Sequence, residues 1–224
     1  MRYLLIIMVI ASLLLSACSS QPTKSDDKEI GEESIQEAWK DFRDGKYANA
    51  EKKFNNIIKS TEPEVFLVGY YGLGWTNIKL RKFQNAKNDF IKFFSLDEEG
   101  VYRPSGYGST AIEDSIFRNV RAGQMIALNA LGEHNNAINT VGTLFERPGN
   151  IITNWFFSHD PAIETLDMRL LKAISHFALG GQNNLQSSLN LVKMIDPLFE
   201  ADITTSEGRL LLCKKLEDLA LERM

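Results

Sequence analysis

This chain has few of the residues from which disulfide frameworks, metal centres and nucleic-acid surfaces are built. Its 224 residues include two cysteines and three histidines, and the formal net charge is -4. Cys18 and Cys213 lack C-x-x-C spacing and make no disulfide framework, which argues against a cysteine metal site. Without a basic excess, nucleic acid and an anionic membrane surface are not expected as partners.

Motifs for catalysis are also missing. The three histidines, at positions 134, 159 and 176, do not have metal-ligand spacing, and we interpret each as structural. Gly106-Tyr107-Gly108 is only a fragment of a phosphate-binding loop, because no strand precedes it and no Gly-Lys-Ser/Thr follows it. We therefore expect no enzyme, no metal and no cofactor.

One long hydrophobic run is present, at the N-terminus. After Arg2, the uncharged stretch YLLIIMVIASLLLSA has 15 residues, which is short for a membrane span of about 20. It ends in Leu15-Ser16-Ala17-Cys18, and this pattern resembles the lipobox of bacterial lipoproteins. The alternatives are an ordinary signal peptide or a membrane anchor that happens to contain a cysteine.

The lipobox resemblance implies a processed and acylated protein. Residues 1–17 would be removed as a signal peptide, and Cys18 would carry fatty acyl chains such as palmitate. The protein would then be anchored by lipid to a bacterial membrane, facing the periplasm. Ser19 points to the outer membrane, if the organism has one. Residues 18–33 comprise the lipidated cysteine and a polar stretch, which predicts a flexible tether.

Small and aromatic residues recur along the remaining domain, residues 34–224. The rings Tyr47 and Phe83 lie 36 residues apart, and a period of this size indicates a stacked repeat. The two best units are Ala38…Tyr47…Ala50…Phe54…Ile57 and Gly74…Phe83…Ala86…Phe90…Phe93. Weaker units are Met125…Gly132…His134…Ala137…Val141 and Ala173…Gly180…Gln182…Leu185…Leu189.

The spacing resembles the tetratricopeptide repeat, a helix-turn-helix of about 34 residues. The resemblance implies an all-α solenoid of about four helical hairpins with a C-terminal capping helix. Small residues are predicted where the two helices of a hairpin cross, so that Gly74 faces Ala86 and Ala38 faces Ala50. For Gly72 the pattern offers only close approach to a neighbouring helix, although a helix interior loses about 1 kcal/mol at each glycine.

Hydrophobic periodicity predicts nine helices and no strand. Capping boxes are predicted at Ser34, Thr61, Thr110 and Thr204, and Asp160-Pro161 is predicted to begin a helix. Gly45 and Gly132 are predicted to end the first helix of their hairpins. The predicted helices span residues 32–44, 47–60, 64–81, 83–96, 110–131, 134–146, 161–179, 183–196 and 204–223.

Two inserts, residues 97–110 and 147–159, interrupt the repeat and are rich in rings. Inserts of repeat proteins collect on one face, which is often the binding face. Tyr102, Arg103 and Tyr107 are candidate partner contacts, with core filling as the open alternative, and Trp155 is a further candidate contact. For Phe156 and Phe157 core filling is the favoured interpretation.

These features predict a membrane-anchored, protein-binding scaffold, with roles in cell-envelope or outer-membrane assembly inferred by analogy. Its partners would be proteins of the envelope, held in an open groove. The alternative is a lipoprotein that binds a small molecule or glycan in a deep, ring-lined pocket formed by the two inserts.

Overall fold

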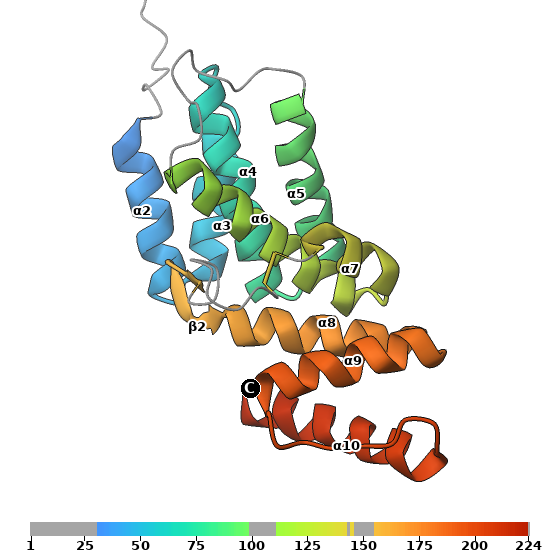
Figure 1. Cartoon of the computed structure of the whole chain (residues 1–224). Helices are drawn as coiled ribbons and strands as arrows, with labels where there is room; N and C mark the ends of the chain where they lie inside the picture. Colours follow the sequence, from blue (N-terminus) through green and yellow to red (C-terminus); the bar gives the residue numbers. More distant parts are fainter. Residues whose placement is uncertain (1–30, 99–110, 143, 146–154, 224) are drawn as a thin grey trace, which may run out of the picture. The chain divides into compact units, whose positions relative to one another are not determined.

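The computed structural model describes residues 31–98, 111–142, 144–145 and 155–223 (Figure 1). This part is mostly helical, as predicted for an all-α protein, with one small sheet. Cys18, Tyr102, Arg103 and Tyr107 lie outside it. The helices are α2 Glu32–Arg43, α3 Tyr47–Ile57, α4 Pro63–Lys79, α5 Phe83–Glu98, α6 Ala111–Ala130, α7 His134–Val141, α8 Thr165–Leu179, α9 Gln182–Ile195 and α10 Ser206–Glu222.

Neighbouring helices in the sequence pack against each other as hairpins. The hairpins are α2–α3, α4–α5, α6–α7 and α8–α9 (Figure 1). The first helix of each hairpin also contacts the first helix of the next, so that α2 meets α4, α4 meets α6 and α6 meets α8. α10 packs against both α8 and α9. The first helices therefore form a connected series along the described chain.

Three of the hairpins turn in the same way. Gly45, Arg81 and Gly132 all have positive φ, at 75°, 59° and 74°. In each turn the N–H of this residue donates to the carbonyl three residues back, and the next N–H donates to the carbonyl five residues back. This is the Schellman motif, which satisfies the last carbonyls of a helix. The ends predicted at the two glycines are confirmed.

The glycines of α4 make room for aromatic rings. A Cβ added at Gly72 would overlap the ring of Phe54 on α3, and one added at Gly74 would overlap the ring of Phe90 on α5. Gly123 on α6 receives the same Phe90 ring. The predicted pairing of Gly74 with Ala86 therefore needs correction, because the nearest atoms to Gly74 belong to the Phe90 ring. Gly72 does allow a neighbouring helix to approach closely.

Residues 156–164 form a hairpin of strands, which the sequence analysis did not predict. β1 is Phe156–Phe157 and β2 is Asp160–Glu164, and the two are antiparallel. The predicted helix start at Asp160-Pro161 is wrong, because these residues belong to β2. α8 begins at Thr165 instead, where the N–H of Glu164 donates to Asp167 Oδ2 at 2.7 Å.

Several other helix boundaries differ from the prediction. α2 has Gly31 as its N-cap and not Ser34, and α4 has Glu62 and not Thr61. At α10 the cap is Thr205, whose Oγ1 accepts from the N–H of Gly208 at 3.0 Å. α7 ends at Val141, earlier than predicted, because Gly142 leaves the helix with φ of 49°. The box predicted at Thr110 lies outside the described residues.

Candidate binding surfaces

An aromatic cluster joins the strand hairpin to the first helices. The ring of Phe157 stacks on Trp75 of α4 with centroids 3.8 Å apart, and its side chain is fully buried. The imidazole of His159 stacks on Trp39 of α2 at 3.6 Å. Tyr71 of α4 lies 5.0 Å from Trp39 and 6.4 Å from Phe157. The hairpin therefore covers the side of α2 and α4 on which these rings lie.

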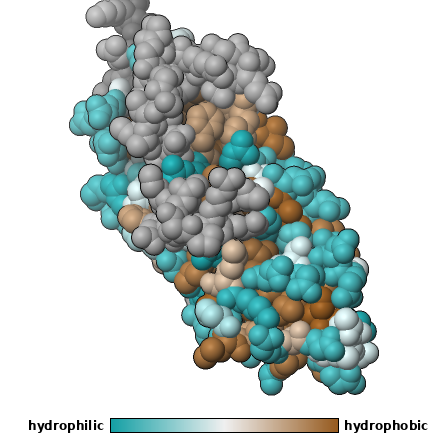
Figure 2. All heavy atoms as spheres, viewed as in Figure 1, coloured by the Kyte–Doolittle hydropathy of each residue, from teal (hydrophilic) through white to brown (hydrophobic). Residues whose placement is uncertain are grey.

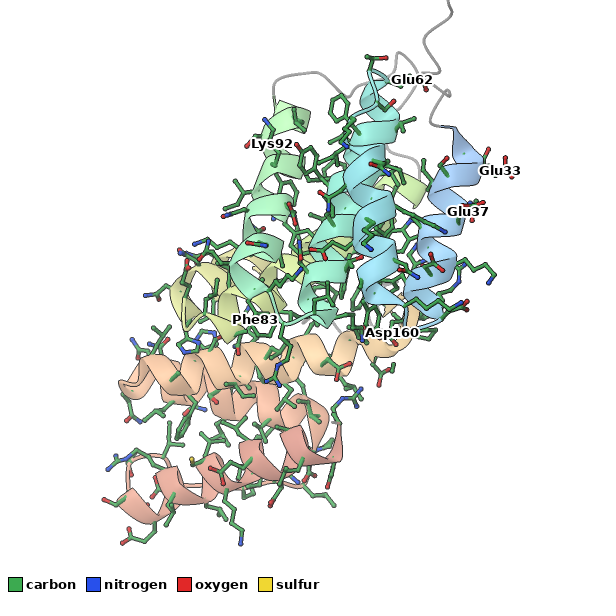
Figure 3. The ribbon with its side chains drawn as sticks, turned by 180° about the vertical axis from the view of Figure 1, so that it is seen from behind. Glu33, Glu37, Glu62, Phe83, Lys92 and Asp160 are labelled. Carbon is green, nitrogen blue, oxygen red and sulfur yellow. The ribbon has the colours of Figure 1, made fainter. Side chains whose placement is uncertain are left out.

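Polar contacts fix this hairpin in place. Trp155 Nε1 donates to Asn119 Oδ1 of α6 at 2.8 Å, and Asn119 Nδ2 donates to the hydroxyl of Tyr71 at 2.9 Å. Asp160, which is labelled in Figure 3, forms an ion pair with Lys79 at the end of α4. Burial raises the pKa of the Tyr71 phenol, so it stays neutral as the acceptor of this network. These contacts connect the strand hairpin and Trp155 to two helical hairpins, α4–α5 and α6–α7.

One side chain of this surface, His159, and one on α5, Asp89, have shifted pKa values. Burial, with a smaller contribution from the charge of Arg43, lowers the pKa of His159 to about 4, so that the imidazole is neutral at pH 7. Burial raises the pKa of Asp89 on α5 to about 6, although the side chain accepts a hydrogen bond from Asn77 at 2.8 Å.

The predicted contact residues are placed as follows. Trp155 is buried, at 7% exposed, so its ring offers little surface to a partner. Phe157 fills the core as predicted, whereas core filling is wrong for Phe156, which is 56% exposed. The candidate contacts of the first insert, Tyr102, Arg103 and Tyr107, lie outside the described residues, as does Cys18.

The predicted repeat positions are mostly in the core. Tyr47 and Phe83, which open the second helices of their hairpins, are half-buried, and Phe83 is labelled in Figure 3. Each hairpin thus buries small and large side chains at the positions where the sequence repeats. The fully buried members are Ala38, Ala50, Phe54, Ala86, Phe90 and Ala137.

A cavity of about 580 Å³ lies among α7, α8 and α9. Ser187, Asn190 and Met194 line it from one face of α9, and Ile138 and Asn139 line it from α7. The lining also includes Gly142, Lys172, His176 and Leu191. Amide, hydroxyl and aliphatic groups alternate there, and aromatic carbon rings do not line it. Such a surface can bond peptide groups and hold apolar side chains at the same time.

Three polar side chains of this cavity, those of Lys172, His176 and Asn190, contact neighbouring residues. Lys172 Nζ donates to the carbonyl oxygen of Gly142. His176 Nδ1 lies 3.0 Å from Asn184 Oδ1. Asn190 Oδ1 accepts from Gln186 at 2.9 Å, which leaves its own NH₂ group for a ligand. Sequence reasoning missed this surface, although the amide-rich stretches HNNAINTV and QNNLQSSLN, which become α7 and α9, were a usable signal.

A second cavity, of about 430 Å³, lies beside the start of α10 and is lined by Glu200, Asp202, Glu207 and neighbouring residues. Hydrogen bonds from Thr204 lower the pKa of Asp202. Across the described residues, His, Cys, Asp and Glu side chains form no group of three or more that could hold a metal ion. Of the two cavities, the amide-lined one is the better candidate for binding a partner.

Comparison with family models, with curated proteins and with solved structures found no match to this chain. Within the part of the chain that the structure describes, none of the helices has both the length and the apolar character of a membrane span.

Proposed function

We propose that this protein is a membrane-anchored scaffold that binds other proteins in the bacterial cell envelope. The observation that carries the proposal is the contact between the first helices of successive hairpins. Stacked helical hairpins of this kind form extended surfaces on which a peptide or helix can lie. We interpret the arrangement as a solenoid similar to tetratricopeptide repeats.

The anchor part of the proposal comes from the N-terminal sequence. Leu15-Ser16-Ala17-Cys18 supports processing before Cys18 and acylation of its thiol. Two or more acyl chains give stable attachment where one chain is marginal. The polar residues 19–31, which precede α2, would then separate the helical domain from the bilayer. The outer membrane is the proposed location in an organism that has one.

The described surfaces favour a protein partner over a solute. The second insert, which could have formed a ring-lined pocket, instead places Trp155 and Phe157 in the core. The cavity among α7, α8 and α9 is lined by Asn139, Ser187 and Asn190, whose side chains can bond the main chain of an extended peptide. We therefore assign partner binding to this cavity among α7, α8 and α9, which is called the groove below.

The test is crosslinked capture of the full-length protein from its own envelope, followed by identification of the partners. Asn190 is exposed on the groove side of α9, and Asn190→Arg should reduce the yield of a specific partner by about tenfold, or 1.4 kcal/mol. Gln182→Arg adds the same charge at an exposed position outside the cavity lining and should leave the yield unchanged.

Either of two outcomes would contradict the proposal. Capture of no protein by the wild type would favour the solute-binding alternative. Equal yields from Asn190→Arg and the wild type, with a defined partner present, would move the binding surface away from the groove.

A further inference from the structure

The outer face of α10 carries leucines that are largely exposed to solvent. Leu210 is 71% exposed and Leu221 is 66% exposed. The opposite face of the same helix is buried, with Leu212, Leu216 and Leu219 in the aliphatic cluster formed with α8 and α9. Figure 2 shows hydrophobic residues at the surface, among hydrophilic ones, at this end of the protein. A helix that ends a stack of repeats is expected to present a polar outer face, and α10 departs from this expectation.

Charged residues stand between these two leucines. Lys214 and Glu217 are exposed, and with Leu210 and Leu221 they recur every three or four residues along one helical face. Neither Lys214 nor Glu217 forms an ion pair among the described residues, and Glu217 has only a long contact of 3.9 Å with Cys213 Sγ. By contrast, Lys215 pairs with Asp196. Lys214 and Glu217 are therefore both available to pair with charges outside the described chain.

Read from the N-terminus, this face presents leucine, lysine, glutamate and leucine. Read from the C-terminus, it presents leucine, glutamate, lysine and leucine. The midpoint between Leu210 and Leu221 is also the midpoint between Lys214 and Glu217. If a second copy of the helix lies antiparallel across this face, Leu210 meets Leu221 of the copy and Lys214 meets Glu217 of the copy. A two-fold axis makes each of these contacts twice. The face is therefore complementary to itself, because apolar side chains meet apolar ones and each positive charge meets a negative one.

We propose that the protein forms a homodimer in which the outer face of α10 pairs antiparallel with α10 of a second copy. Burial of the four leucines supplies the attraction, and the two Lys–Glu pairs set the register and exclude a parallel arrangement, in which like charges would meet. The contact involves one helix from each copy, so it lies below the usual area of about 1,200 Å² for stable complexes. Weak association, strengthened by confinement to a membrane, is expected.

Charge reversal tests this pairing without altering the buried face. In a dimer of the Lys214→Glu variant, the glutamate at position 214 of each chain faces Glu217 of the other chain. In a dimer of the Glu217→Lys variant, Lys214 of each chain faces the lysine at position 217 of the other. Each variant alone should lose self-association by at least about tenfold. A mixture of the two variants restores both opposite-charge pairs, because the chain with Lys214→Glu is acidic at both positions of this face and the chain with Glu217→Lys is basic at both. The mixed pair should therefore associate as the wild type does.

The measurement uses full-length chains that carry two different C-terminal tags, are produced together and are extracted in mild detergent. Capture on one tag followed by detection of the other reports association for each combination. Lys52→Glu, a reversal at an exposed site on α3, is the control and should keep wild-type capture. Helical content and melting temperature are recorded for every variant to show that it is folded.

The outcomes separate clearly. Loss for each single variant with recovery in the mixture supports the antiparallel pairing. Absence of wild-type capture, unchanged capture by both single variants, or loss without recovery in the mixture would each overturn it. Leu210→Glu gives an independent check, since a charge in place of this exposed leucine should also abolish capture while the fold persists.

Discussion

The hairpins near the N-terminus and the helices near the C-terminus pack with different side chains. Rings dominate the first region, and the buried ones are Trp39, Phe42, Phe54, Tyr71, Trp75, Phe90 and Phe93. The buried members of the cluster of α8, α9 and α10 are aliphatic and include Leu185, Leu189, Leu212 and Leu216, while the rings of Phe177 and Phe199 pack against it partly buried. Because a ring is rigid and flat, it needs a gap of fixed shape, whereas leucine adapts by changing rotamer.

The glycines follow this difference. Gly72, Gly74 and Gly123 lie where the rings of Phe54 and Phe90 enter the helix interface. In the C-terminal helices no ring enters at a glycine of the described chain: Ala173 is a small buried residue of the aliphatic cluster, and the buried Gly208 of α10 lies against the main chain of Asp202. The two regions also differ in what covers them, since the strand hairpin closes the ring side of α2 and α4, while a cavity remains among α7, α8 and α9.

The largest effect is expected at Phe157, which connects the hairpin to the aromatic region. Phe157→Ala removes a fully buried ring stacked on Trp75 and should lower the free energy of unfolding by about 3–5 kcal/mol. Phe156→Ala is the matched control, because that ring is 56% exposed, and it should cost less than about 1 kcal/mol. Chemical denaturation of both variants measures the difference. Similar midpoints would show that the hairpin does not support the fold.

A smaller loss is expected when the glycines are filled. Gly72→Ala and Gly74→Ala would each place a methyl group in the ring of Phe54 or Phe90, and should destabilise by about 1–3 kcal/mol. The direction of the stability change is informative, because alanine in the interior of a helix is otherwise more stabilising than glycine by about 1 kcal/mol. Lys92→Ala, on the exposed side of α5 (Figure 3), is the control and should change stability by under about 0.5 kcal/mol. A stabilised Gly74→Ala protein would contradict the ring contact.

Local signals explain what the sequence could predict about this fold. The helical period of apolar residues predicted the helices, and Gly45 and Gly132 predicted two of the turns, because both signals depend on neighbours in the chain. The strand hairpin was missed because its conformation is stabilised by distant groups. The ring of Phe157 stacks on Trp75, and Trp155 donates a hydrogen bond to Asn119. The partners of each pair are far apart in the sequence, so a local pattern cannot predict them.

The candidate site was less predictable than the fold for the same reason. The groove requires Asn139 of α7 and Asn190 of α9 to face one cavity, and their separation in sequence gives no indication of it. Trp155 was predicted as a contact because inserts of repeat proteins often collect on the binding face. Its N–H instead donates to Asn119, and the ring is buried. Exposure depends on such partners, which only the three-dimensional arrangement reveals.

Acidification should weaken the aromatic region through His159. The pKa of this imidazole is about 4 in the folded protein and 6.5 in the unfolded chain, so the unfolded state takes up the proton first as the pH falls. The stabilisation is present above pH 6.5 and is lost as the pH decreases towards 4. Because the side chain is only half-buried, solvent screening reduces the loss to about 1–2 kcal/mol.

The comparison of wild type with His159→Phe isolates this contribution. Asp89, whose pKa of about 6 lies above its ordinary value, acts in the opposite direction, since its protonation favours the folded state as the pH falls below 6. It does so in both proteins and cancels in the difference. Urea denaturation at pH 7 and pH 4.5 should show a smaller acid loss for His159→Phe. An equal loss would show that His159 titrates normally.

The smallest effect is expected at the turn between α4 and α5. Arg81 has φ of 59° where the equivalent turns have Gly45 and Gly132, and a side chain in this left-handed region costs about 1 kcal/mol relative to glycine. Arg81→Gly removes this strain but gives the unfolded chain more freedom, so a net gain of up to about 0.5 kcal/mol is expected. Gly45→Ala introduces the same strain at the first turn and should destabilise by about 1 kcal/mol, although a Cβ there meets no other atom. Thermal unfolding of the two variants compares one turn with another. If Arg81→Gly destabilised the protein as much as Gly45→Ala does, the side chain of Arg81 would have to make a stabilising contact that outweighs its backbone strain.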